Sequence, residues 1–197
     1  MCPSDESELR HLMYTALHHC SGPVAVRYPR GAGVGAPLDE PFRKLPLGKG
    51  RIVRRGEDIL LCSIGTTLHS ALKAASDLQA AYGMSCTVVD ARFVKPLDEE
   101  LFTAEAPRHQ LVCTIEDHCL PGGFGSAVLE LLSDYGIVLQ RSLIRIGVPD
   151  EFVSHGTQAE QRARYGLNAQ GIVARIVKAL GLVEETAKSG EGVSQVG

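Results

Sequence analysis

Apolar positions follow two patterns along most of the chain. Short, nearly continuous apolar runs are typical of strands buried on both faces, and an apolar residue at every third or fourth position is typical of helices. The apolar runs predict strands at 51–54 (an edge strand), 59–64, 86–91, 111–116 and 142–147. The periodic segments predict helices at 66–81, 97–105 and 125–135, and a last helix between Asn168 as N-cap and Gly181 as C-cap.

Strands that alternate with helices indicate an α/β fold, in which helices cover both faces of a mainly parallel sheet to give three layers. We place this domain at residues 50–183. Residues 31–49 are rich in glycine and proline and are predicted to be a linker. Residues 184–197 are small and polar, and we expect them to be disordered.

Residues 1–30 have the pattern of one helix followed by one strand. Ser4 and Asp5 are good N-caps, and Asp5 with Glu8 resembles a capping box. Residues 24–28 are predicted to be a short strand that ends at Pro29. One helix and one strand bury too little surface to fold alone. We therefore interpret this unit as the last helix and strand of a sheet whose other strands precede it.

Composition excludes several classes of protein. The net charge of -3, with acids and bases interspersed, disfavours nucleic-acid binding. No apolar run approaches the roughly 18 residues of a membrane span, and the first residues lack the charged-then-apolar pattern of a signal peptide. Three of the six cysteines, Cys62, Cys86 and Cys113, fall in strand-like runs, and no two cysteines form a C-x-x-C pair. We expect buried thiols in a reducing, cytoplasmic compartment and no metal site.

Arg30 is the main candidate for ligand binding. It follows the predicted strand 24–28, and α/β sheets bind ligands at the carboxyl ends of their strands. Its guanidinium suits a phosphate dianion, and Pro29 and Gly31 would fix the turn around it. Spacing alone favours a solvated or paired loop arginine, because exposed arginine is common. Arg27 lies within the predicted strand and is the second candidate, with a structural role as its alternative.

The run from Ile115 to Ser126 joins two acids to a glycine-rich turn that opens a helix. Such a turn can bind anions, but it is neither a P-loop nor a G-x-G-x-x-G motif, and its acids would repel phosphate. We therefore interpret it as a tight turn with a capped helix. Glu116, Asp117 and His118 are suited to acid–base chemistry, but neighbours on a strand point to opposite faces.

Other polar residues give weaker signals. His155 has no visible partner and is interpreted as a surface or capping histidine. Asp90 and Arg92 are predicted to form an ion pair that shapes a turn. No combination of serine, histidine and aspartate has the pattern of a catalytic triad, and we assign no catalytic, cofactor-binding or metal-binding residue.

Five segments occur in the order found in 1-deoxy-D-xylulose-5-phosphate synthases. They are GPVAVRYPRG, LPLGKG, DARFVKPLD, IEDHCLPGGFGSAVLE and GVPDEFVSHGTQAEQRARYGL. Over nearly all of residues 3–181 the chain resembles the C-terminal part of these enzymes. DARFVKPLD and the double-glycine turn are also similar to the C-terminal domain of the wider transketolase group.

The resemblance implies a thiamine diphosphate and magnesium enzyme that joins pyruvate to D-glyceraldehyde 3-phosphate with loss of CO2. Its product leads to isoprenoids, thiamine and pyridoxal, and the enzyme is a homodimer. Residues 1–30 would end a pyrimidine-binding domain, and residues 50–183 would be a transketolase C-terminal-like domain. The second arginine of RYPRG, here Arg30, would help to bind the substrate phosphate.

The cofactor-binding groups of the family have no counterpart here and are expected upstream. The chain alone is therefore predicted to have no synthase activity. Two alternatives remain open: a non-catalytic dimerisation or regulatory module, and one subunit of a split transketolase-type enzyme.

Overall fold

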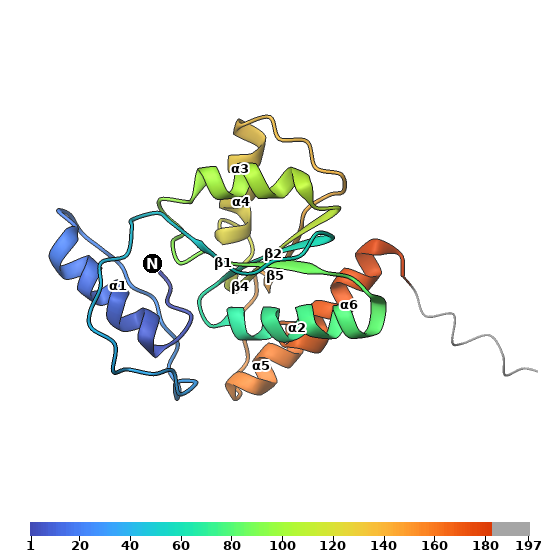
Figure 1. Cartoon of the computed structure of the whole chain (residues 1–197). Coiled ribbons are helices and arrows are strands. Elements are labelled where there is room, and N and C mark those ends of the chain that lie inside the picture. Colours follow the sequence, from blue (N-terminus) through green and yellow to red (C-terminus); the bar gives the residue numbers. More distant parts are fainter. Residues whose placement is uncertain (183–197) are drawn as a thin grey trace, which may run out of the picture.

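A mainly parallel sheet forms the centre of the protein (Figure 1). The computed structural model describes residues 1–182, and five strands in this part of the chain form one sheet in the order β1-β3-β2-β4-β5. The strands are β1 Arg51–Arg54, β2 Ile59–Ile64, β3 Cys86–Asp90, β4 Leu111–Cys119 and β5 Ile144–Val148. β2 to β5 are mutually parallel, and β1 pairs antiparallel with β3 at the edge. The predicted edge strand is confirmed.

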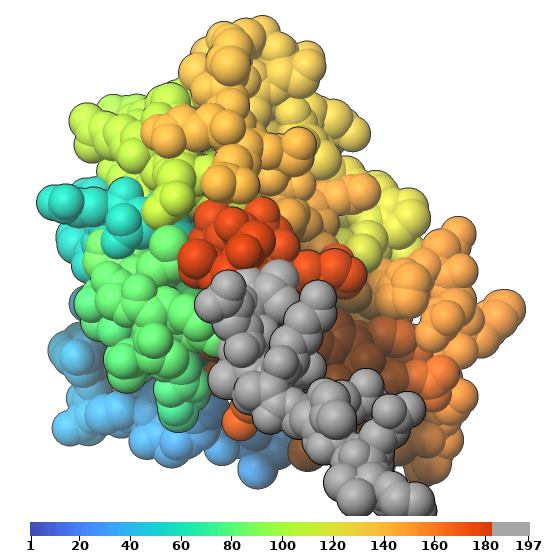
Figure 2. Space-filling model, turned by 90° about the vertical axis from the view of Figure 1, so that its right-hand side faces the viewer, coloured from blue at the N-terminus to red at the C-terminus, as the bar shows by residue number. Residues whose placement is uncertain are grey.

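Helices cover both faces of the sheet, so the predicted three layers are confirmed (Figure 1). The helices are α1 Glu6–His19, α2 Thr67–Tyr82, α3 Glu99–Glu105, α4 Phe124–Asp134, α5 Gln158–Arg164 and α6 Ala169–Leu180, with a 3₁₀ turn at Ala106–Arg108. α2 and α6 pack on one face and lie next to each other (Figure 2). α3 and α4 pack on the other.

The central strands are buried on both sides, as their continuous apolar sequence requires. Every residue of β2 and β3 is buried. Cys62, Cys86 and Cys113 are all buried, as predicted, and burial raises the pKa of the Cys86 thiol to about 12. These thiols therefore stay protonated at neutral pH and act as small apolar side chains.

Most predicted boundaries hold within one or two residues. Asp98 caps α3 by accepting a hydrogen bond from the Leu101 N–H, so the helix begins at Glu99 and not at Leu97. Asn168 caps α6 through the Gly171 N–H, and Gly181 ends it with a left-handed backbone, as predicted. Three features were not predicted: α5, the 3₁₀ turn, and the extension of β4 to Cys119.

Residues 24–28 do not form a strand, and that prediction is wrong. Their backbone has only a short pairing with the first residue of the chain. The Arg27 N–H donates to the Met1 carbonyl at 2.9 Å, and the Met1 ammonium donates to the Ala25 carbonyl at 2.9 Å. An extended tendency becomes a strand only with a longer ladder, which residues 1–182 do not provide here.

Glu8 has a different role from the predicted one. Asp5 caps α1 through the Glu8 N–H, but the Glu8 carboxylate does not complete a capping box. It binds Arg92 in bidentate geometry, with N–O distances of 2.9 and 2.8 Å, and lies 3.1 Å from Arg51. The predicted Asp90–Arg92 pair is also wrong, because Asp90 pairs with Arg51 at 3.0 Å. This buried network fixes α1 to the sheet.

Two predictions concern other parts of the chain. Residues 31–49 contain no helix or strand, and their role as a linker stays a prediction. The proposed tail, residues 184–197, lies outside the described residues, as does the domain boundary at 183. Among the described helices, none combines the length and apolar character needed to cross a membrane.

Candidate functional site

The order of the parallel strands defines the position where a ligand site is expected. From β2 the chain crosses over one face, through α2, to β3. From β4 it crosses over the opposite face, through α4, to β5. The connections that leave the carboxyl ends of β2 and β4 therefore run to opposite sides of the sheet. The space between these two strand ends is a topological switch point, where open α/β sheets bind ligands. Thr66 follows β2 at this point, and Asp117 lies near the end of β4.

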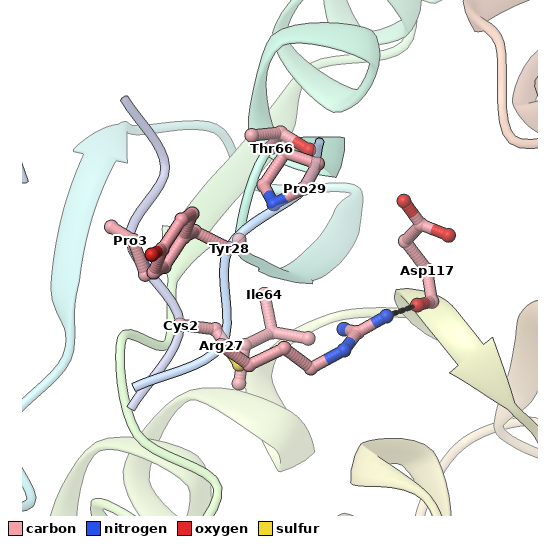
Figure 3. A pocket seen from close by; sticks show the side chains of 9 residues that line it. Cys2, Pro3, Arg27, Tyr28, Pro29, Ile64, Thr66 and Asp117 are labelled. Atoms are coloured by element: carbon pink, nitrogen blue, oxygen red, sulfur yellow. Dashed lines mark hydrogen bonds between the residues drawn. The ribbon is translucent and has the colours of Figure 1, made fainter. Parts of the chain in front are cut away.

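A cavity of about 40 Å³ lies at this switch point (Figure 3). Three separate stretches of chain line it: Cys2–Pro3, Arg27–Pro29, and the strand ends at Ile64–Thr66 and Asp117. The segment that was predicted to bind a ligand thus lies at the carboxyl edge of the sheet.

Arg27 crosses this cavity (Figure 3). Its guanidinium donates a hydrogen bond to the main-chain carbonyl of Asp117. A second guanidinium approaches from α5, where Arg162 donates to the Thr66 hydroxyl at 2.8 Å and lies 4.0 Å from the Asp117 carboxylate. Two guanidinium groups and one carboxylate therefore meet beside the cavity.

Arg30 lies outside this cavity. The residue is exposed, and its carbonyl accepts a hydrogen bond from the Gln158 amide at 3.1 Å. Pro29 lines the cavity, so the turn predicted around Arg30 does bring its backbone close to the edge of the sheet. Of the two candidate arginines, Arg27 faces the switch point, and Arg30 extends from the neighbouring surface.

The glycine-rich turn after β4 is filled by a carboxylate of the chain itself. Glu116 accepts hydrogen bonds from the N–H groups of Phe124 and Gly125, at 2.6 and 2.8 Å. A Cβ at Gly123 would lie 2.2 Å from the Glu116 carboxylate, so this residue must be glycine for the contact to form. The interpretation as a tight turn with a capped helix is confirmed.

Burial raises the pKa of Glu116, against the opposing effect of its hydrogen bonds from Gly125 and Phe124. Asp117 is half-buried and His118 is exposed, so the three neighbours do not share one environment. His155 is exposed in the loop before α5. Within residues 1–182 no three side chains of the metal-binding types gather into a possible metal site.

Arg162 is the feature that sequence reasoning missed. α5 is short and none of its residues is buried, so it has no apolar stripe to reveal it. Its signal was the capping box formed by Thr157 and Glu160, whose side chains and N–H groups bond reciprocally.

Comparison with known proteins agrees with this architecture. Residues 48–172 match the family described as transketolase, C-terminal domain. The chain belongs to this family.

Relatives extend the match to the N-terminal residues. The chain is 54% identical over 194 residues to a 1-deoxy-D-xylulose-5-phosphate synthase of Anaeromyxobacter sp. (strain Fw109-5). The matched region covers 96% of the chain and 30% of the relative. It is 50% identical over 174 residues to 1-deoxy-D-xylulose-5-phosphate synthase 1 of Geobacter sulfurreducens, which covers 88% of the chain and 27% of the relative. The chain thus spans less than a third of the length of these relatives. The resemblance found in the sequence is confirmed.

Solved structures share the fold. A split gene transketolase, described as an inactive tetramer of four beta subunits, has a TM-score of 0.78 and 32% identity to this chain. The match covers 92% of this chain and 57% of that one. A transketolase mutant from Pichia stipitis has a TM-score of 0.51 and 17% identity, over 70% of this chain and 19% of that one, and shows the fold alone.

Proposed function

We propose that this chain is the C-terminal part of a 1-deoxy-D-xylulose-5-phosphate synthase. The intact enzyme, a cytoplasmic homodimer, condenses pyruvate with D-glyceraldehyde 3-phosphate and releases CO2. Its product is a precursor of isoprenoids, thiamine and pyridoxal. The proposal is carried by 54% identity that extends over 96% of the chain, including the segment that precedes the transketolase C-terminal domain.

A chimera tests this identity. The 197 residues would replace the matching segment of the Anaeromyxobacter relative, and synthase activity would be measured as product formed from the two substrates. We expect the chimera to form product well above the control, because the same family fold would place RYPRG at the same edge of the sheet. The relative without this segment is the control. A folded chimera no more active than that control would refute the proposal.

Thiamine diphosphate and magnesium would be held by other domains of the intact enzyme. The residues described here do not fit this group, because they contain no cluster of metal-ligating side chains and Glu116 occupies the glycine-rich turn. The chain alone is therefore expected to be inactive, and turnover of pyruvate by the purified chain would contradict this.

The role proposed for this part of the enzyme is architectural, together with recognition of the substrate phosphate by Arg30 and, as second choice, Arg27. Both belong to RYPRG, and Arg27 lies at the switch point, where Arg162 of α5 also approaches Asp117. A guanidinium is suited to a phosphate dianion because it is always charged and donates in a fixed fork.

We expect Arg30→Ala in the active chimera to raise the KM for D-glyceraldehyde 3-phosphate by roughly 10- to 100-fold, the effect of one charged hydrogen bond. The KM for pyruvate should not change. Arg141→Ala, another exposed arginine, is the matched control. If only Arg27→Ala raises this KM, the phosphate role belongs to Arg27. If neither variant does, RYPRG does not bind phosphate.

A split transketolase-type subunit is the second candidate, favoured by the match to the split gene transketolase. In that case the separate chain, mixed with the remaining part of the Anaeromyxobacter relative, should restore pyruvate decarboxylation. Activity from the fused chimera but not from the mixture would exclude this candidate. A purely non-catalytic module has no use for a phosphate-binding arginine, and activity of the chimera would exclude it too.

A further inference from the structure

Residues 34–45, here called the strap, lie beside α1 and connect the RYPRG segment to the sheet (Figure 1). The strap has no regular structure of its own, yet its backbone is bound by side chains of α1 along its length. At its start, the Glu6 carboxylate accepts hydrogen bonds from the N–H groups of Val34, Gly35 and Ala36, at 3.1, 2.6 and 3.0 Å.

The middle of the strap is held by Arg10. Its guanidinium donates to the carbonyl groups of Leu38 and Glu40, and it lies 4.6 Å from the centre of the Phe42 ring. Phe42 also stacks on Tyr14, with ring centres 5.7 Å apart. The Arg10 contacts involve no group that titrates near neutral pH, because arginine stays charged, so they hold the middle of the strap across this range. Tyr14 also lies against the rings of His18 and His19, with ring centres 4.7 and 5.7 Å apart.

The end of the strap is held by two buried acceptors. The Leu45 N–H donates to the Thr15 hydroxyl at 2.9 Å, and the Arg43 N–H donates to Nδ1 of His11 at 3.3 Å. Leu45 itself packs with Leu12 in a small apolar cluster. This end therefore depends on a histidine ring that must accept a hydrogen bond.

His11 can accept this bond only in its neutral form. An imidazole whose Nδ1 is an acceptor carries its proton on Nε2, and protonation would turn Nδ1 into a second donor facing the Arg43 N–H. The residue is fully buried, and Nε2 has no hydrogen-bond partner within the described structure. A charged ring here would therefore be both desolvated and poorly bonded.

The surrounding charges do not offset this cost. Burial lowers the pKa of His11 first of all, and Arg43 of the strap and Arg10 of α1 lower it further. Glu8 and Glu40 raise the pKa of His11. Each is already paired, however: Glu8 with Arg92 and Arg51, and Glu40 with Arg43 at 3.6 Å.

We propose that His11 is a pH-sensitive switch, whose protonation releases the end of the strap, residues 43–45, from α1. Linkage between proton binding and closing gives the direction of the pH effect. A histidine whose pKa is lower in the closed form than in the open form stabilises the closed form above the open-form value, near 6.5. This stabilisation is lost as the pH falls below that value, by roughly tenfold in the closing equilibrium for each pH unit, until the closed-form pKa is reached.

The test is amide hydrogen exchange of the 197-residue chain between about pH 7.5 and about pH 5, corrected for the intrinsic pH dependence of exchange. We expect protection of the Arg43 and Leu45 N–H groups to fall with acid while that of β2 stays constant. His11→Gln keeps an acceptor that does not titrate, so its protection should be independent of pH. His155→Gln, a change at an exposed histidine in the loop before α5, should respond like the parent.

A parallel NMR titration of the His11 ring in the parent protein tests the proposal even if the variant misfolds. In the parent, the ring should titrate at the same pH at which the strap amides lose protection. Titration of His11 without loss of protection would overturn the proposal, and so would a pH response that survives in folded His11→Gln.

Discussion

A single carboxylate decides what the turn after β4 can bind. In sequence, a glycine-rich turn that opens a helix can be an anion site, but the two acids before it favour a capped helix. In the structure Glu116 is buried and its oxygens occupy the N–H groups where an external anion would bind. The glycine is needed because no side chain fits between this carboxylate and the backbone.

At this residue scale we predict that Gly123→Ala destabilises the protein by about 1–3 kcal/mol, the usual cost of overpacking a buried site. Its Cβ would lie 2.2 Å from the Glu116 carboxylate and 2.4 Å from the Cys119 carbonyl. Urea unfolding measures the change. Gly22→Ala is the control, because a Cβ there meets nothing within 4 Å. Equal midpoints for the two variants would contradict the prediction.

At the scale of elements, α1 is held in place by ions rather than by a large apolar contact. Glu8, with a side chain only 3% exposed, binds Arg92 next to the end of β3 and Arg51 on β1. Met13 and Leu17 of the same helix remain exposed. The attachment of α1 to the sheet therefore depends on a few buried polar bonds.

We predict that Glu8→Gln weakens this attachment by roughly 3 kcal/mol, because it leaves Arg92 buried without its counter-charge. Hydrogen exchange should show lost protection in α1 and unchanged protection in α2. Glu130→Gln, a change at an exposed position of α4, is the control and should have no effect. Unchanged exchange of α1 in Glu8→Gln would show that other contacts hold the helix.

At the scale of the whole molecule, contacts between residues far apart in sequence join the first thirty residues to the α/β sheet. Ser4 donates to Asp90 at 3.1 Å, the Cys2 N–H donates to the Arg92 carbonyl at 2.8 Å, and Arg27 bonds to Asp117. The N-terminal unit and the α/β domain are two units in sequence, but these bonds join them across the carboxyl edge of the sheet.

We therefore predict one cooperative unfolding transition for both units. Circular dichroism and the exchange of α1 amides should give the same denaturant midpoint, since coincident probes indicate two-state behaviour. An earlier loss of α1, well before the sheet unfolds, would show that the units fold independently.

Local pattern determined most of the α/β domain. Strand and helix periods depend on residues a few positions apart, and caps such as Asn168 are local too, so β2, α2, β3 and α6 could be predicted closely. The sequence motifs likewise identified the family, because each motif is contiguous. α5 escaped prediction since it is short and has no buried face.

Tertiary structure decided the partners of the polar residues. Arg92 binds Glu8, 84 positions away, and not its neighbour Asp90, and Arg27 bonds to Asp117, 90 positions away. Residues 24–28 have the composition of a strand, but strand formation depends on which backbone lies alongside, and none of these residues is in a strand. A side chain or strand can only bond to what the fold brings within reach, and such distant contacts leave no periodic trace in the sequence.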